Sequence, residues 1–305
     1  MLTWVMVDRV DAYDCPDSED VLAAVESCST EDQALVAHWK FDEGAGDVVK
    51  DSSRNENDGI IRPTDTSEPK WGTGQFVGSI SSGSDHFVLV PPSASLNSLK
   101  KQITVVAYIY PRTLWVPTEL STVERLWTKA IRLARKLLAF GRERRPPVTP
   151  FIAIAQRQWG ETVHPDQYYL GYGRRNDVLH YKWHLGLLDG EISLYRLPED
   201  QPKPPTGSWV HLAGTYNGET GNMSIYVGGK LIGTRTHTGE IRLDQDSVNR
   251  QLAIGAELNG ASIDEPSGVF DGYISDVRIY NRALSERAIK ELYEEAENQV
   301  ISGRP

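Results

Sequence analysis

The chain contains a long series of short segments that are rich in β-branched and aromatic residues, and Gly, Pro, Asn or Asp turns separate them. Four of them read ITVVAYIYP, VLHYKWHLG, WVHLAGTYN and GYISDVRIY. Segments of this length and spacing are typical of an antiparallel sandwich or barrel and exclude regular alternation of strands and helices. Gly228 and Gly229 join two alternating runs, which predicts a two-residue hairpin. The sequence therefore predicts an all-β domain.

Residues 119–145 break this pattern and predict an inserted basic amphipathic helix. Ser121 and Glu124 are spaced as in a capping box, and Gly141 stands where the helix would end. Eight Lys and Arg against three Glu give this window about +5, whereas the whole chain carries −10. Such a helix can cover the sandwich, dock to a protein partner or lie on a membrane surface. We favour a helix that covers one face of the sandwich. Docking to a protein partner is the second alternative, and binding to a membrane surface is the third.

A second helix is expected near the C-terminus, where LSERAIKELYEEAENQ follows the last strand segment. Ser285 is placed to cap it, and Ala288, Ile289, Leu292 and Tyr293 form its apolar face. This helix completes the elements that the sequence predicts.

Charge and hydropathy limit the class of protein. A net charge of −10 argues against a nucleic-acid partner, whose electrostatic footprint would be basic. No apolar run reaches the ~18–20 residues that span a bilayer, and Asp8 and Arg9 end the apolar patch at Leu2–Val7. We therefore expect a cytoplasmic chain by default. Cys15 and Cys28 are too few for a disulfide framework, so free thiols are predicted.

Several segments together resemble the laminin-G-like members of the concanavalin-A-like lectin/glucanase superfamily. Their order and spacing carry the resemblance over residues 35 to about 296. The matching pieces are LVAHWKFDEGAGDVVKDSSRNENDG, PKWGTGQFVGSI, DHFVLVPPSASLN, ITVVAYIYP, GSWVHLAGTYNGETGNMSIYVGGKLIGTRT, LAIGAE and FDGYISDVRIYNRALSERAIKELY. The resemblance implies a two-sheet antiparallel jelly-roll sandwich whose first and last strands lie together. The family is often extracellular.

The expected organisation has three parts. Residues 1–33 form an N-terminal extension with a short strand and a helix, and residues 34–298 form the jelly-roll domain with the helical insertion 119–145. Residues 299–305 are expected to be a flexible tail.

The Asp- and Asn-rich stretch after the first strand invites a metal prediction. Asp51, Ser53, Asn55 and Asn57 are spaced by two, as in a calcium helix-loop-helix loop. That assignment fails, because the sixth position holds Glu rather than Gly and the twelfth holds Arg rather than Glu.

The family resemblance implies a different arrangement, with one structural calcium ion held by three residues from separate segments. The matching ligands are Asp42, Asn57 and Asp276. The alternative is that Asp42 and Asp276 cap turns and pair with Lys or Arg.

The sequence favours a non-catalytic protein. Glucanases of this superfamily place their carboxylates on one strand as Glu-x-Asp-x-x-Glu, and no such stretch occurs. The nucleophile motif Gly-x-Ser-x-Gly is also missing. His180 and His184 lie about 13 Å apart along a strand, too far to share a metal ion.

Aromatic residues concentrate in the middle of the chain, beside arginines. Lectin-like sites place aromatic faces against the apolar face of a sugar, and arginines would suit an acidic one. The alternative is that about half of these aromatic residues fill the core. The predicted ligand-binding residues are Trp159, Tyr169, Tyr172, Arg174, Tyr181 and Trp183.

Together these features favour a carbohydrate-recognition module with a structural calcium ion. One alternative is an accessory or assembly component of an intracellular complex that docks through helix 119–145. A further alternative is a glycan hydrolase or lyase with an atypical site.

Overall fold

The computed structural model divides the chain into two units, Met1–Leu35 and Val36–Pro305, and the description below concerns the second. It describes residues 33–63, 71–72, 80–81, 86–114, 152–158, 166–175, 178–201, 203–243, 251–258 and 268–302. The predicted basic helix 119–145, both cysteines, Trp159 and nearly all of the extension 1–33 lie outside these residues. So does the side chain of Arg174.

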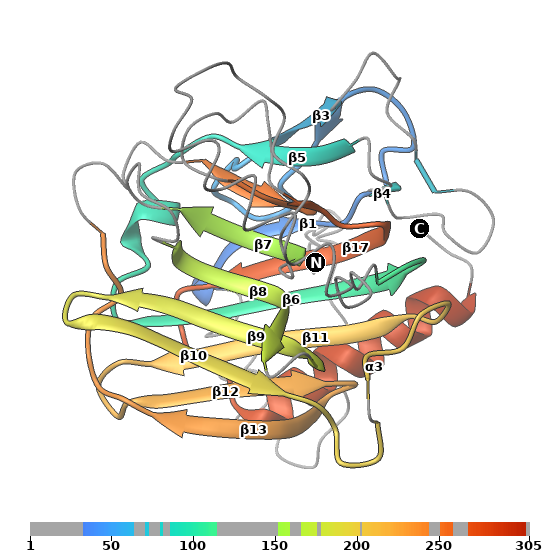
Figure 1. Cartoon of the computed structure of the whole chain (residues 1–305). Helices are drawn as coiled ribbons and strands as arrows, with labels where there is room; N and C mark the ends of the chain where they lie inside the picture. Colours follow the sequence, from blue (N-terminus) through green and yellow to red (C-terminus); the bar gives the residue numbers. More distant parts are fainter. Residues whose placement is uncertain are drawn as a thin grey trace, which may run out of the picture. The chain divides into compact units, whose positions relative to one another are not determined.

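Two antiparallel β-sheets pack face to face, as the all-β jelly-roll prediction requires (Figure 1). The first sheet follows the order β1 (Leu35–Trp39), β17 (Gly272–Tyr280), β6 (Gln102–Pro111), β11 (Val210–Asn217), β12 (Asn222–Val227) and β13 (Lys230–Thr236), and β4 (Ile80–Ser81) pairs with β17. The first and last of the described strands, β1 and β17, are therefore neighbours, as expected.

The second sheet has eight strands. Its order is β10 (Gly190–Arg196), β9 (Val178–Leu187), β8 (Asp166–Arg175), β7 (Ile152–Gln158), β14 (Leu252–Ile254), β5 (His86–Val90), β3 (Gly59–Pro63) and β2 (Val48–Val49). A short ladder of β15 (Ala256–Glu257) with β16 (Gly268–Val269) and a 3-10 turn, η2 (Leu96–Ser98), complete the β-domain.

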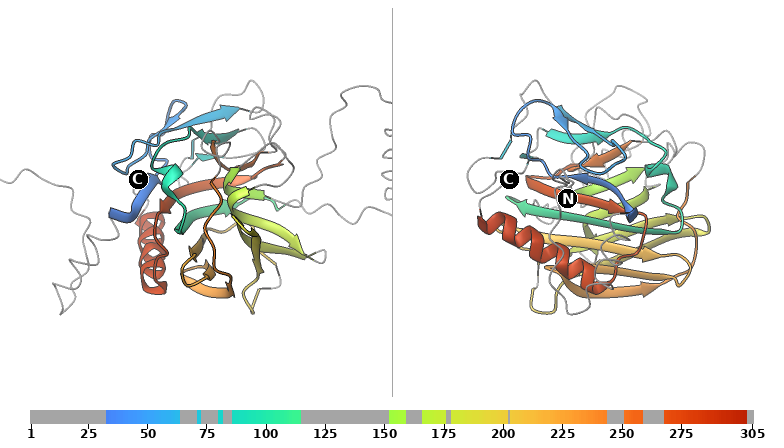
Figure 2. Two further views of the ribbon diagram at one scale, coloured as in Figure 1. Left: turned by 90° about the vertical axis from the view of Figure 1, so that its left-hand side faces the viewer. Right: turned by 180° about the vertical axis from the view of Figure 1, so that it is seen from behind.

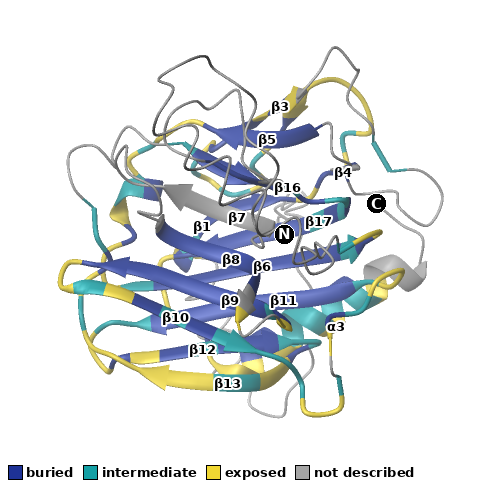
Figure 3. Ribbon diagram, in the orientation of Figure 1, coloured by how far each residue is buried: buried dark blue, intermediate teal, exposed yellow. Residues whose placement is uncertain are grey.

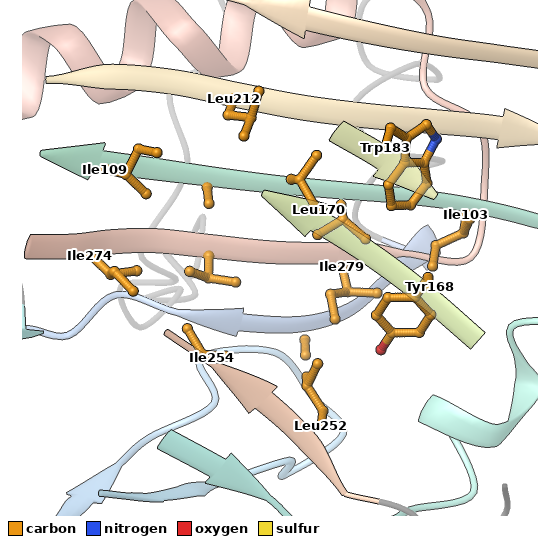
Figure 4. Packing of buried hydrophobic residues seen from close by; sticks show 14 of the residues in the cluster. Ile103, Ile109, Tyr168, Leu170, Trp183, Leu212, Leu252, Ile254, Ile274 and Ile279 are labelled. Atoms are coloured by element: carbon orange, nitrogen blue, oxygen red, sulfur yellow. The ribbon is translucent and has the colours of Figure 1, made fainter. Parts of the chain in front are cut away.

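Alternation along the strands builds the core between the sheets. On β6, Ile103, Val105, Ala107 and Ile109 all face the core with no exposure. On β9, Trp183 does so, and its Nε1 donates to the carbonyl of Thr215 at 3.1 Å. Figure 4 shows this layer, and Figure 3 shows the central strands as buried.

The predicted hairpin is confirmed. Val227 of β12 pairs with Lys230 of β13, and Gly228 and Gly229 between them have φ of +55° and +69°. Two successive positive φ angles are those of a type I′ turn, which glycine adopts without steric cost.

The predicted C-terminal helix is α3 (Glu286–Ser302), which lies on the outer face of the seven-stranded sheet (Figure 2, left). The backbone N–H of Ala288 donates to Ser285 Oγ, so the predicted cap is present. Ala288, Ile289 and Ala296 are its buried apolar residues. The helix runs to Ser302, three residues past Gln299, the last residue of the predicted helical stretch. Within the described residues no helix is long and apolar enough to cross a membrane.

Packing of Trp183 against Gly214 makes a testable prediction. A Cβ at Gly214 would lie 2.5 Å from Trp183 Cδ2, so Gly214→Ala must displace a buried indole. We expect a loss of about 1–3 kcal/mol in the free energy of unfolding, measured by urea denaturation. Gly173→Ala is the matched control, because the atoms nearest its Cβ belong to the edge of the half-buried Tyr195 ring and to the Lys182 side chain, which can shift more easily than the indole. Equal losses for the two variants would contradict this account.

Candidate functional site

The stretch after β1 is organised by the side chain of Asp51. Its Oδ1 accepts hydrogen bonds from the backbone N–H groups of His38 and Ser53, both at 2.8 Å. Its Oδ2 accepts from Ser53 Oγ and from the backbone N–H of Asn57, also at 2.8 Å. One carboxylate thus satisfies four donors, which is how Asp commonly stabilises turns. The spacing that resembled a calcium loop is that of a turn.

Asn57 joins this loop to two other segments. Its Nδ2 donates to the carbonyl of Val36 at 2.8 Å and to Ser95 Oγ at 3.0 Å. Its Oδ1 accepts from Ser93 Oγ at 2.5 Å. The indole of Trp39 donates to its backbone carbonyl at 2.8 Å. Both oxygens of Asn57 therefore already accept hydrogen bonds.

Asp276 lies in a buried ion network on the outer face of the seven-stranded sheet. Its Oδ1 accepts from His38 Nε2 and from Arg278 Nε, each at 2.7 Å. Arg278 Nη1 donates in turn to Glu295 Oε2 of α3 at 2.9 Å. Burial acts to raise the pKa of Asp276, but Arg278 and His38 overcome it and hold that pKa far below the ordinary value. The carboxylate is ionised and already paired with a cation.

Asp42, Asn57 and Asp276 do not fit a calcium ion in this arrangement. The Arg278 guanidinium already pairs with Asp276 Oδ1 and would repel a second cation, although Oδ2 of Asp276 is buried without a hydrogen-bond partner among the described residues. Asp42 is exposed, and the described residues contain no group of three or more His, Cys, Asp or Glu that could hold a metal ion. Calcium binding therefore stays a prediction that these contacts do not favour.

A thermal melt tests the metal prediction. We expect EDTA to leave the Tm unchanged, because a bound ion would have to raise stability by mass action. Asp276→Asn should lower the free energy of unfolding by about 3–5 kcal/mol with or without calcium, since it leaves Arg278 buried beside a neutral group. A Tm that falls with EDTA in the wild type but not in Asp276→Asn would instead support the metal site.

Most of the predicted ligand-binding aromatic residues belong to the core. Tyr172, Tyr181 and Trp183 have no exposed surface and pack between the sheets, and the rings of Tyr172 and Tyr181 lie 5.4 Å apart. Tyr169 lies on the other face of β8, but it is also fully buried, with Lys182 Nζ 4.3 Å from its ring centroid. A sugar cannot stack on a ring that has no exposed face. In this structure these four residues form no sugar platform.

Half-exposed aromatic rings lie instead on the outer face of the seven-stranded sheet. Tyr273 of β17, Tyr110 of β6 and Trp209, just before β11, lie on three neighbouring strands, and we call them the aromatic strip. The ring centroids of Tyr273 and Tyr110 are 6.2 Å apart, and those of Tyr110 and Trp209 are 5.7 Å apart. Each ring keeps part of its surface open.

Polar groups flank the outer end of the strip. Arg112 Nη2 lies 2.8 Å from Asp271 Oδ1, and its guanidinium carbon lies 5.3 Å from the centroid of the Tyr273 ring. Thr113 Oγ1 donates to Asp271 Oδ2 at 2.6 Å. Aromatic surface beside fixed donors and acceptors is the chemistry that holds a sugar, because a sugar has one apolar face and a rim of hydroxyls.

One side of the strip lies against residues covered by α3. Tyr108 stacks on Trp209 at 4.9 Å with 7° between the ring planes, and its hydroxyl donates to Glu297 of α3 at 2.5 Å. Burial and the Glu297 carboxylate raise the pKa of Tyr108. His211 lies next in line, 6.5 Å from the Tyr108 ring and 5.7 Å from Tyr293 of α3. The helix therefore bounds the strip along this side.

Sequence reasoning missed the aromatic strip, although a signal for it was present. In ITVVAYIYP the aliphatic residues alternate with Tyr108 and Tyr110, which places both tyrosines on the face opposite the core. Trp209 and Tyr273 lie at the start of two equally clear strand patterns, WVHLAGTYN and GYISDVRIY. The strand order that brings the three together cannot be derived from these patterns one at a time.

Comparison with known proteins agrees with this fold. Residues 148–290 match a family model of laminin G type, described as the concanavalin A-like lectin/glucanases superfamily. The chain is laminin-G-like over these residues. The pentraxin-related protein PTX3 of Mus musculus is 33% identical over 87 residues, which are 28% of this chain and 22% of that protein. The human protein gives 33% over 90 residues. The match thus spans under a quarter of these relatives.

Solved structures share this two-sheet fold at low sequence identity. Domain 4 of AbnA, an extracellular arabinanase from Geobacillus stearothermophilus, superposes with a TM-score of 0.52 at 16% identity, over 85% of this chain and 98% of that one. A structure of botulinum neurotoxin type C gives a TM-score of 0.56 at 15% identity, over 88% of this chain and 52% of that one. These likenesses establish the two-sheet fold.

His211 makes the stability of the domain depend on pH. Burial lowers its pKa to about 4, with nearby Arg278 acting in the same direction and Asp276 against it. In the unfolded chain the pKa is near 6.5, so the unfolded state binds this proton first as pH falls. Stability is therefore lost between about pH 6.5 and 4, by roughly 3 kcal/mol in total.

His211→Gln should reduce the slope of the free energy of unfolding against pH in this range, measured by urea denaturation at a series of pH values. His237→Gln is the control, because His237 is 44% exposed and should leave the slope unchanged. A slope equal to the wild type's in His211→Gln would show that other groups set the pH dependence.

Proposed function

We propose that this domain is a non-catalytic carbohydrate-recognition module that binds sugar on the aromatic strip. The observation that carries the proposal is the row of three half-exposed rings, Tyr273, Tyr110 and Trp209, with the Arg112–Asp271 pair at its end. Rings that are held by their neighbours lose little conformational freedom when a ligand stacks on them. The ion pair supplies hydrogen-bond donors and acceptors in a fixed geometry.

Structural relatives support the class of ligand. The AbnA domain was solved in complex with arabinotriose, and cell entry of botulinum neurotoxin type C depends on interaction with two ganglioside molecules. Both are carbohydrate-containing ligands bound by proteins of this fold. Fold alone does not give function, so the proposal rests on the strip and takes only its ligand class from these neighbours.

The carboxylates beside the strip favour binding over hydrolysis. Glycoside hydrolysis needs two carboxyl groups that face the sugar, one of them able to donate a proton. Asp271 accepts hydrogen bonds from Arg112 and Thr113, and Glu297 accepts from Tyr108. Each is held as an acceptor by its neighbours, which suits a structural or sugar-orienting role.

Glycan binding by three proteins tests the proposal. We expect the wild type to bind on a glycan array and Trp209→Ala to bind at least tenfold more weakly, because a stacked base or ring is worth about 1–3 kcal/mol. Tyr195→Ala is the matched control, since Tyr195 is a half-exposed tyrosine on the other sheet. Loss in Tyr195→Ala alone would place the site on the eight-stranded sheet. Absence of any glycan binding, with or without EDTA, would defeat the proposal.

The docking alternative rests on helix 119–145, which lies outside the described residues, and it stays a prediction. Deleting this segment and measuring co-purifying proteins separates it from sugar recognition. Loss of a protein partner with glycan binding intact would support docking as an additional role.

A further inference from the structure

We infer that the aromatic strip selects a neutral oligosaccharide of about three sugar units, laid across β17, β6 and β11, and disfavours acidic sugars. The inference rests on the proposed function and narrows it to a ligand class. Two observations carry it: the charge around the strip and the spacing of its rings.

The charge argument begins with the cations, both of which are already paired. Arg112 directs its Nε and Nη2 to Asp271 Oδ1, at 2.9 and 2.8 Å. Arg278 is buried and bonded to Asp276 and Glu295. An acidic sugar would have to compete with a carboxylate that is bonded in place, whereas a neutral hydroxyl needs only the remaining N–H groups of Arg112.

Carboxylates outnumber cations among the paired charged side chains of the strip and its α3 side. The ion pairs and hydrogen bonds described at the strip and along its α3 side involve two cations and four carboxylates, a net charge of −2: Arg112, Arg278, Asp271, Asp276, Glu295 and Glu297. His211 adds no charge near neutral pH, because burial lowers its pKa to about 4. A sugar carboxylate or sulfate on the strip therefore meets net repulsion, on a chain that itself carries −10.

The length argument uses the ring spacing. The centroids of Tyr273 and Tyr110 are 6.2 Å apart and those of Tyr110 and Trp209 are 5.7 Å apart, over three strands whose outer members lie about 10 Å from one another. One sugar ring is about as wide as one tyrosine ring and can cover only one of these positions. Tyr108, which donates to Glu297 of α3, lies two residues before Tyr110 on β6, so α3 bounds the strip along one side and the row itself offers three ring positions.

Calorimetry with matched oligosaccharides tests both parts. We would use neutral and uronic-acid oligosaccharides of one to four units, taking the backbone that the glycan array favours. Affinity for neutral ligands should rise at least tenfold from one unit to three and then level off. The acidic trisaccharide should bind at least tenfold more weakly, and added salt should narrow that gap by screening the repulsion.

Asp271→Asn tests the charge argument within the site. The substitution removes one carboxylate and releases Arg112, so it should bring the acidic trisaccharide to within threefold of the neutral one. Asp189→Asn is the control, because it makes the same change at an exposed residue with no contact to the strip. Tm values of both variants confirm that they remain folded.

The outcomes separate this inference from the function beneath it. Preferential binding of acidic sugars by the wild type, or equal affinity for one unit and three, would overturn the inference and leave carbohydrate recognition intact. Binding of no sugar would overturn both.

Discussion

The buried ion pair between Asp276 and Arg278 is the interaction on which the outer face of the seven-stranded sheet depends. It lies on the last strand, and through it that strand holds His38 of the first strand and Glu295 of α3. Removing one member of such a pair leaves the other charge buried without its partner, which lowers the free energy of unfolding by about 3–5 kcal/mol. Asp276 has a φ of +47°, where the pairing of β17 with β6 shifts register. The strain is tolerated because the resulting carboxylate position satisfies two donors.

The same network decides how much of the aromatic surface stays open. α3 is fixed over this sheet by Glu295 on Arg278 and by Glu297 on Tyr108. The helix covers His211 and Tyr108 but leaves Tyr110, Trp209 and Tyr273 partly exposed. The contacts that hold α3 on the sheet therefore also define the boundary of the candidate binding surface. The cation that pairs with Asp276 in this network is the guanidinium of Arg278.

Alternation of residues predicted the strands well but predicted the site poorly. The density of aromatic residues led to the prediction of a ligand site on β8 and β9. Large rings are common there because they fill this part of the core, as Tyr172, Tyr181 and Trp183 do. Period-two alternation assigns side chains to two faces of a strand and does not say which face meets the second sheet. The predicted metal ligands show the same limit. The sequence shows that Asp42, Asn57 and Asp276 carry side-chain oxygens, but it does not show which groups bond to them, such as His38 and Arg278 at Asp276.

The sequence by itself determined the local elements: short antiparallel strands, the Gly228–Gly229 hairpin, the Ser285 cap and the helix that follows. Each depends on neighbours within a few residues. The tertiary structure alone decided that His38 meets Asp276, 238 positions away, and that three aromatic residues from separate segments share one face. The physical reason is that burial and charge pairing are properties of packed sheets, and the packing brings together residues that no local pattern relates.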